Sequence, residues 1–141
     1  MQTDFKITHQ TVVNAHVSDV WKALTDPKMV RQYFFGSNLE TTWKVGKPVR
    51  FYGEYKGTRY EDKGIVLEYN ENDKISYSYH SSWTTLPDEP QYYLEVSYQV
   101  KKIPGGTELT ISQTNYDEEK AQHSLQNWEV VTRRLKELIE Q

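Results

Sequence analysis

The chain has 141 residues and no cysteine, which excludes a disulfide framework, a thiolate metal site and a cysteine nucleophile. Its formal net charge of -3 comes from 17 Lys plus Arg against 20 Asp plus Glu, and no basic stripe of the kind found in nucleic-acid-binding proteins is present. No apolar run reaches the roughly 20 residues that span a bilayer and no signal-peptide pattern is visible, so we expect a cytoplasmic protein without a membrane span.

The first part of the chain predicts one strand followed by two short helices. Residues 5–13 alternate between apolar and polar side chains, which is typical of a strand. Ser18 offers an N-cap for a short helix that continues through Leu24. Pro27 suits the first position of a second short helix, which ends in the compact aromatic segment Tyr33–Gly36.

From Leu39 onward the apolar residues recur at every second position, which predicts about six consecutive antiparallel strands. Turn residues and one proline-rich loop at 84–90 separate these strands, which we expect at 39–43, 49–55, 59–69, 75–83, 92–100 and 109–113. Within the third of them, Gly64 indicates a bulge or the close approach of another backbone segment.

The last segment, between Asp117 and Glu140, predicts one long amphipathic helix. Its apolar residues follow spacings of three and four, which places them on one face: Ala121, Leu125, Trp128, Val131, Leu135 and Leu138. A helix of this length measures about 36 Å and would run along the whole sheet. The sequence therefore predicts an α+β fold, a single domain over residues 1–141, in which a curved antiparallel sheet of about six or seven strands wraps around the C-terminal helix.

Several short segments match those of a known family in order and spacing. They are Val20-Trp21-Lys22-Ala23-Leu24-Thr25-Asp26-Pro27, Gly46 before Val49–Phe51, Gly64-Ile65-Val66, Gly105-Gly106-Thr107-Glu108-Leu109-Thr110, Asn127-Trp128 and Leu135-Lys136-Glu137-Leu138. In this respect the chain resembles the START-related helix-grip (SRPBCC, birch-pollen-allergen-like) superfamily, and within it the homologues of the heat-shock-protein ATPase activator. The resemblance implies a deep, mainly apolar cavity between sheet and helix. Members bind lipids, sterols, polyketides or other ring compounds, some catalyse reactions in the cavity, and others contact a chaperone.

The aromatic content, 11 Tyr, 4 Trp and 4 Phe, suggests what the sheet encloses. Tyrosine combines an apolar ring with a hydroxyl that needs a polar partner, so aromatic inner faces suit a pocket for a ring-bearing ligand. The alternative is that the same rings fill a closed core. The residues predicted to line the pocket are His9, Phe51, Tyr55, Tyr77, Tyr79, Trp83, Tyr98, Gln113 and Trp128.

Motifs for other chemistry are not present in the sequence. The four histidines have no metal-ligand spacing, so we expect no metal site, and no nucleophile elbow or phosphate loop is found, so we expect no cofactor and assign no catalytic residue. Only His9 lies on the apolar side of its strand, where it could act as an acid or base. The acidic residues Glu61, Asp62, Glu68, Glu71 and Asp73 are predicted to be solvated.

These patterns leave three functional hypotheses. We favour a protein that binds a small hydrophobic, lipid-like or aromatic ligand in a cavity between the sheet and the C-terminal helix. The second is a cavity enzyme of the cyclase, dehydratase or hydrolase type. The third is a protein that contacts a chaperone and stimulates its ATPase activity.

Overall fold

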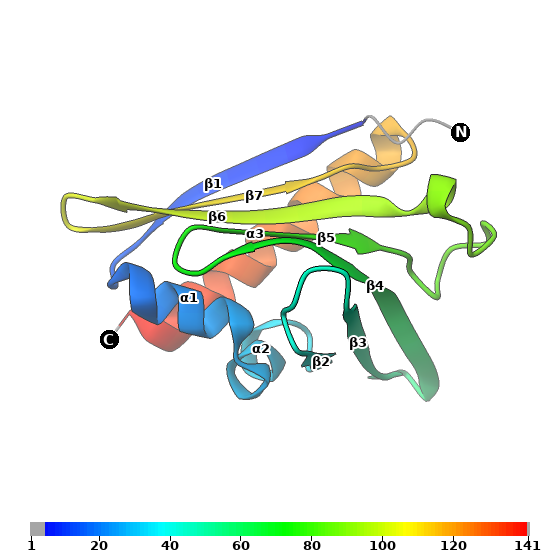
Figure 1. Ribbon diagram of the computed structural model, residues 1–141, viewed down its shortest axis with the longest axis horizontal. Coiled ribbons are helices and arrows are strands. Elements are labelled where there is room, and N and C mark those ends of the chain that lie inside the picture. Colours follow the sequence, from blue (N-terminus) through cyan, green and yellow to red (C-terminus); the bar gives the residue numbers. More distant parts are fainter. Residues whose placement is uncertain (1–4, 141) are drawn as a thin grey trace.

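Seven antiparallel strands form one curved sheet, and the long C-terminal helix α3 (Glu118–Ile139) crosses one of its faces (Figure 1). This computed structural model describes residues 5–140. The strand order is β1-β7-β6-β5-β4-β3-β2, so every neighbouring pair except β1–β7 is joined directly along the chain. The strands are β1 (Ile7–Val13), β2 (Asn38–Thr41), β3 (Pro48–Tyr55), β4 (Thr58–Asn70), β5 (Lys74–Tyr79), β6 (Leu94–Ile103) and β7 (Gly106–Gln113). The predicted α+β helix-grip architecture is confirmed.

Two short helices, α1 (Val17–Thr25) and α2 (Pro27–Tyr33), follow β1 as predicted. The side chain of Asp26 caps α2 by accepting a hydrogen bond from the backbone N–H of Lys28 at 2.9 Å. The predicted cap of α1 is wrong, because Ser18 lies inside that helix. His16 occupies the N-cap position and makes no capping bond through its side chain.

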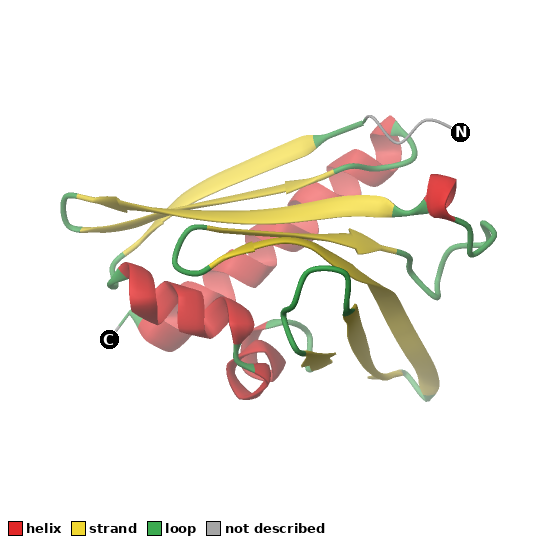
Figure 2. Ribbon diagram, in the orientation of Figure 1, coloured by secondary structure: helices red, strands yellow, loops and turns green. Residues whose placement is uncertain are grey.

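The predicted strand 75–83 is too long. The last bridge on this side joins Lys63 and His80, and Figure 2 shows the chain beyond it as loop with one short helix, η1 (Pro90–Tyr92). His80 fixes this loop: its Nε2 lies 3.1 Å from the carbonyl oxygen of Pro87, and its ring stacks on Tyr93 at 5.0 Å between centroids. The side-chain alternation of β5 therefore does not extend to Trp83.

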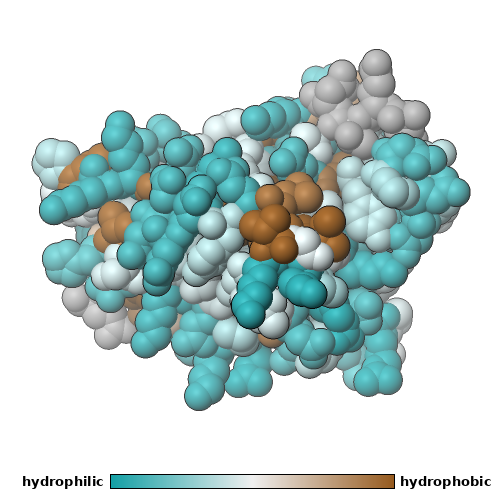
Figure 3. All heavy atoms as spheres, in the orientation of Figure 1, coloured by the Kyte–Doolittle hydropathy of each residue, from teal (hydrophilic) through white to brown (hydrophobic). Residues whose placement is uncertain are grey.

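Apolar side chains between α3 and the sheet form the core, in which Tyr77, Ile75, Leu109 and Leu135 are almost completely buried. The opposite face is mainly polar, with a small apolar patch near the middle of the view in Figure 3. Exposed apolar side chains in this part of the fold are Val45, before β3, and Ile65 and Leu67 on β4. None of the helices within residues 5–140 is long and apolar enough to cross a membrane.

Gly64 lies where β4 comes closest to β5. A Cβ atom at this position would be 1.7 Å from the carbonyl oxygen of Ser78, so no larger residue fits without moving a strand. The register of β4 against β5 shifts between Val66 and Glu68, a few residues further along. The close approach predicted at Gly64 is confirmed.

We expect Gly64→Ala to lower the free energy of unfolding by at least about 3 kcal/mol, because the methyl group would overlap backbone rather than a flexible side chain. Gly105→Ala is the control: its site is open but has a φ of 84°, and we expect a loss of about 1 kcal/mol from backbone strain alone. Urea denaturation would measure both. Equal losses would contradict the steric argument.

Candidate functional site

Five aromatic side chains between the sheet and α3 contact one another in a closed sequence, which we call the aromatic circle. Its members are Phe34, Phe51, Tyr77, Tyr98 and Trp128. Centroid separations around the circle are 5.3, 5.8, 5.7, 5.8 and 5.6 Å, ending with Trp128 against Phe34. Strands β3, β5 and β6, helix α3 and the turn after α2 each supply one ring. Four of the five were predicted from the sequence to line the pocket.

The polar tips inside this region bind to one another. The hydroxyl oxygens of Tyr77 and Tyr98 are 2.7 Å apart, and the indole N–H of Trp128 donates to Oε1 of Gln113 at 2.7 Å. Burial raises the pKa of Tyr77 and Tyr98, so both hydroxyls stay protonated. Gln113, predicted from the sequence to be a polar lining group, therefore orients the tryptophan.

Phe34 differs from the other four members because it lies on a turn instead of a strand or long helix. The two residues after it, Phe35 and Gly36, have left-handed backbone conformations with φ of 51° and 72°. Phe35 is 50% exposed, and the guanidinium carbon of Arg134 lies 5.3 Å from its ring centroid. The sequence marked this segment as aromatic and compact, but Phe34 was not predicted as a site residue.

Asp62 lies beside the circle. It is directly opposite Phe51 in the β3–β4 register, so its side chain is on the same, helix-facing side of the sheet. Its carboxylate accepts hydrogen bonds from the hydroxyl of Tyr79 at 3.1 Å and from the backbone N–H of Ser82 at 3.2 Å. Burial raises the pKa of Asp62. The expectation that Asp62 is solvated is wrong. Asp62 is four residues before the buried Val66 on the same strand, so the alternation of side chains places both on one face, and this pattern could have revealed its position.

The cations near Asp62 bind elsewhere. Lys63 Nζ is 2.6 Å from Asp88, and Arg50 forms ion pairs with Glu61 and Glu40 on the other side of the sheet. Within residues 5–140, no lysine or arginine forms an ion pair with Asp62.

Five of the nine predicted lining residues lie outside the circle: Gln113 and Tyr79, described above, and Tyr55, Trp83 and His9. Tyr55 is 59% exposed at the end of β3, and Trp83 is 55% exposed with its ring 6.1 Å from that of Tyr60. His9 faces α3 at the edge strand β1, where Nε2 is 2.9 Å from Thr132 Oγ1. Since this hydroxyl donates to the carbonyl oxygen of Trp128, it accepts a hydrogen bond from His9.

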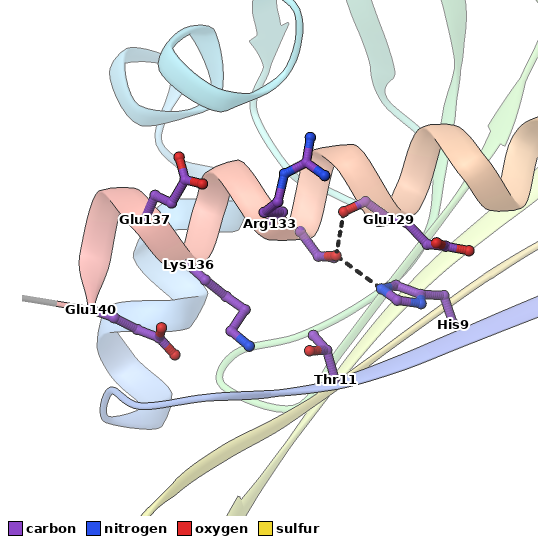
Figure 4. Close-up of a pocket in the computed structure, with 8 residues that line it drawn as sticks. His9, Thr11, Glu129, Arg133, Lys136, Glu137 and Glu140 are labelled. Carbon is purple, nitrogen blue, oxygen red and sulfur yellow. Dashed lines mark hydrogen bonds between the residues drawn. The ribbon is translucent and has the colours of Figure 1, made fainter.

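His9 also lines an open groove of about 590 Å³ between β1 and α3 (Figure 4). Side chains of both charges surround this groove, among them Glu129, Arg133, Lys136 and Glu140. Its polar, mixed-charge lining differs from the apolar cavity that the sequence predicted. Among the described residues, no three His, Cys, Asp or Glu side chains are grouped so that they could hold a metal ion.

Comparison with known proteins assigns the family. The sequence model described as Activator of Hsp90 ATPase homolog 1-like protein (AHSA1) matches residues 14–140. The chain belongs to this family. No curated protein matches it in sequence.

Solved structures similar to this AHSA1-family chain cover nearly all of it. A Cytophaga hutchinsonii protein, whose structure was determined in solution, is 35% identical over 99% of this chain and 97% of its own, with a TM-score of 0.84. A Mesorhizobium loti protein is 16% identical over 96% of each chain, with a TM-score of 0.78. The Aha1 dimer of Colwellia psychrerythraea is 18% identical over 96% of each chain, with a TM-score of 0.75. The last two comparisons show a shared fold.

We expect Asp62→Asn to be at least as stable as the wild type at pH 7. A carboxyl whose pKa is raised in the folded protein binds its proton more tightly there than in the unfolded chain, so ionisation lowers the free energy of unfolding at neutral pH. This loss disappears as the pH falls below the ordinary aspartate pKa of about 4. The stability advantage of Asp62→Asn should therefore shrink with falling pH in urea denaturation.

The control variant is Glu61→Gln, on the neighbouring position and the opposite face. The Arg50 guanidinium lowers the pKa of Glu61, so this carboxylate contributes stability at neutral pH that is lost on acidification. Glu61→Gln should be less stable than the wild type at pH 7 and equal to it in acid. An Asp62→Asn variant with the same pH dependence as Glu61→Gln would contradict the assigned environment of Asp62.

Proposed function

We propose that this protein binds a small apolar, ring-bearing ligand between α3 and the sheet, and that the ligand takes the place of Phe34 in the aromatic circle. The observation that carries the proposal is that one member of a closed set of aromatic contacts lies on a turn. The other four are held by strand hydrogen bonds or by the long helix. A flat ligand ring in that place would make the contacts that Phe34 makes now.

The contacts of Phe34 describe the ligand that would fit. Its ring stacks on Phe51 with an interplanar angle of 23° and meets Trp128 edge-on at 76°. Such aromatic pairs contribute about 0.5 to 1.5 kcal/mol each beyond the burial of apolar area. A ligand with one or more aromatic rings recovers both contacts, whereas a saturated chain recovers only the burial.

The hydroxyl pair of Tyr77 and Tyr98 supplies a polar contact. Two hydroxyls carry two protons, and the bond between them uses one. The second proton can be donated to a carbonyl or hydroxyl oxygen of the ligand. This arrangement supports recognition of a ring compound that carries an oxygen.

The same chemistry favours binding over catalysis. Tyr77 and Tyr98 are the titratable members of the circle, and burial raises the pKa of both. A general acid or base works best when its pKa is near the working pH, which these two phenols do not approach. These two phenols therefore give no support to the cyclase, dehydratase or hydrolase alternative, and we propose a binding function in preference to it.

Replacing Phe34 with alanine should increase the affinity for ring compounds, because the ligand would no longer have to displace a side chain. We expect Phe34→Ala to lose about 3 kcal/mol of stability and to bind two- and three-ring compounds at least tenfold more tightly than the wild type. Ligand-observed NMR with a panel of such compounds would measure the dissociation constants.

Phe35→Ala is the matched control, since Phe35 lies on the same turn but is half exposed outside the circle. It should leave the affinities unchanged within twofold. A folded Phe34→Ala protein that binds the panel no better than the wild type would overturn the displacement of Phe34. Failure of the wild type and both variants to bind any member of the panel would overturn the binding function itself.

A further inference from the structure

We propose that the ligand carries a protonated amine and that the carboxylate of Asp62 binds this amine at the edge of the aromatic circle. This inference rests on the proposed binding function and names the class of ligand: an aromatic ring that carries a protonated alkylamine, rather than a neutral lipid or sterol. It is carried by the position of one carboxylate, its surroundings and the pairing of the cations nearby.

Asp62 is within reach of a ligand in the circle. Directly opposed residues on antiparallel strands have Cβ atoms about 4.5 to 5.5 Å apart, and Asp62 opposes Phe51. Phe51 is the ring on which Phe34 stacks. A ligand ring in the place of Phe34 therefore needs only a short side chain to bring an amine to the carboxylate.

No lysine or arginine within residues 5–140 forms an ion pair with the Asp62 carboxylate. A charged side chain removed from water is usually paired with an opposite charge, because its desolvation is otherwise uncompensated. Here Lys63 pairs with Asp88 and Arg50 pairs with Glu61. His80 is the basic group whose charge would act on Asp62, and its Nε2 lies at the carbonyl oxygens of Leu86 and Pro87. A cationic ligand would supply the missing charge.

Further aromatic side chains are linked to Asp62 and its strand. Tyr79 donates to it, Tyr60 lies two residues earlier on the same strand and face, and the ring of Trp83 lies 6.1 Å from that of Tyr60. Aromatic faces attract ammonium groups, and a carboxylate among aromatic rings is a favourable site for them. Trp83, predicted as a lining residue, is one of these aromatic side chains.

A purely structural role does not account for the charge. Asp62 accepts the backbone N–H of Ser82 and so holds the start of the loop between β5 and β6. The side-chain oxygen of an asparagine can accept the same bond, and its amide can donate to the hydroxyl of Tyr79. The side chain of Ser81 also hydrogen-bonds to the carboxylate. A neutral amide could keep contacts of this kind in weaker form, so they do not require the negative charge, which is available for recognition of a cation.

The test uses matched pairs of probes that differ only in charge: 2-(naphthalen-2-yl)ethylamine with 2-(naphthalen-2-yl)ethanol, and 2-phenylethylamine with 2-phenylethanol. Dissociation constants are measured by NMR titration at pH 7 for the wild type, Asp62→Asn and the control Glu61→Gln. In the wild type each amine should bind about tenfold or more tightly than its alcohol. Asp62→Asn should abolish that preference by weakening the amine alone, and Glu61→Gln should keep it.

The outcomes separate this inference from the function on which it depends. If amine and alcohol bind equally well to the wild type, or if Asp62→Asn keeps the preference for the amine, the role of Asp62 is overturned while the binding function stands. If neither member of either pair binds to the wild type, the binding function is overturned together with the inference. Amide chemical shifts of Asp62→Asn that match those of the wild type away from residue 62 establish that the variant is folded.

Discussion

Trp128 joins the C-terminal helix to the sheet, and the aromatic circle depends on the contacts of this side chain. Its indole N–H is bound to Gln113 on β7, which fixes the ring plane. One edge contact joins it to Tyr98 on β6 and another to Phe34 on the turn after α2. One helix is narrower than a seven-stranded sheet, so side chains from other elements must fill the space beside it. A large side chain on the helix that contacts those side chains fixes the helix in place. The aromatic circle is the result.

Much of this fold could be predicted because its signals are periodic. Alternation every second residue gave the strands, and spacings of three and four gave α3, with Asp117 at its N-cap. The errors occur where periodicity ends. Trp83 follows the alternation of β5 by number, yet the chain leaves the sheet after His80, whose ring bonds to carbonyl oxygens of the following loop. Tyr55 has the predicted parity but is the last residue of β3 and is exposed.

The candidate site was harder to predict because it depends on contacts between distant segments. Four members of the circle lie on strands or on α3, where the periodic patterns could identify them. Phe34 could not be identified in this way, since it is the C-cap of the short helix α2 and the chain turns directly after it. Asp62 was missed for the opposite reason: its strand pattern was readable, but a charged residue is normally solvated. The register with Phe51 shows that it faces the helix, in agreement with its parity with Val66 on the same strand.

The most direct test of this account is the position of a bound ring compound in the protein. In a sample with labelled aromatic side chains, intermolecular nuclear Overhauser effects would report which rings lie within about 5 Å of the ligand. A ligand in the place of Phe34 would give contacts from the bound naphthalene ring to Phe51, Tyr77 and Trp128. Contacts confined to the groove between β1 and α3, around His9 and Lys136, would contradict this placement.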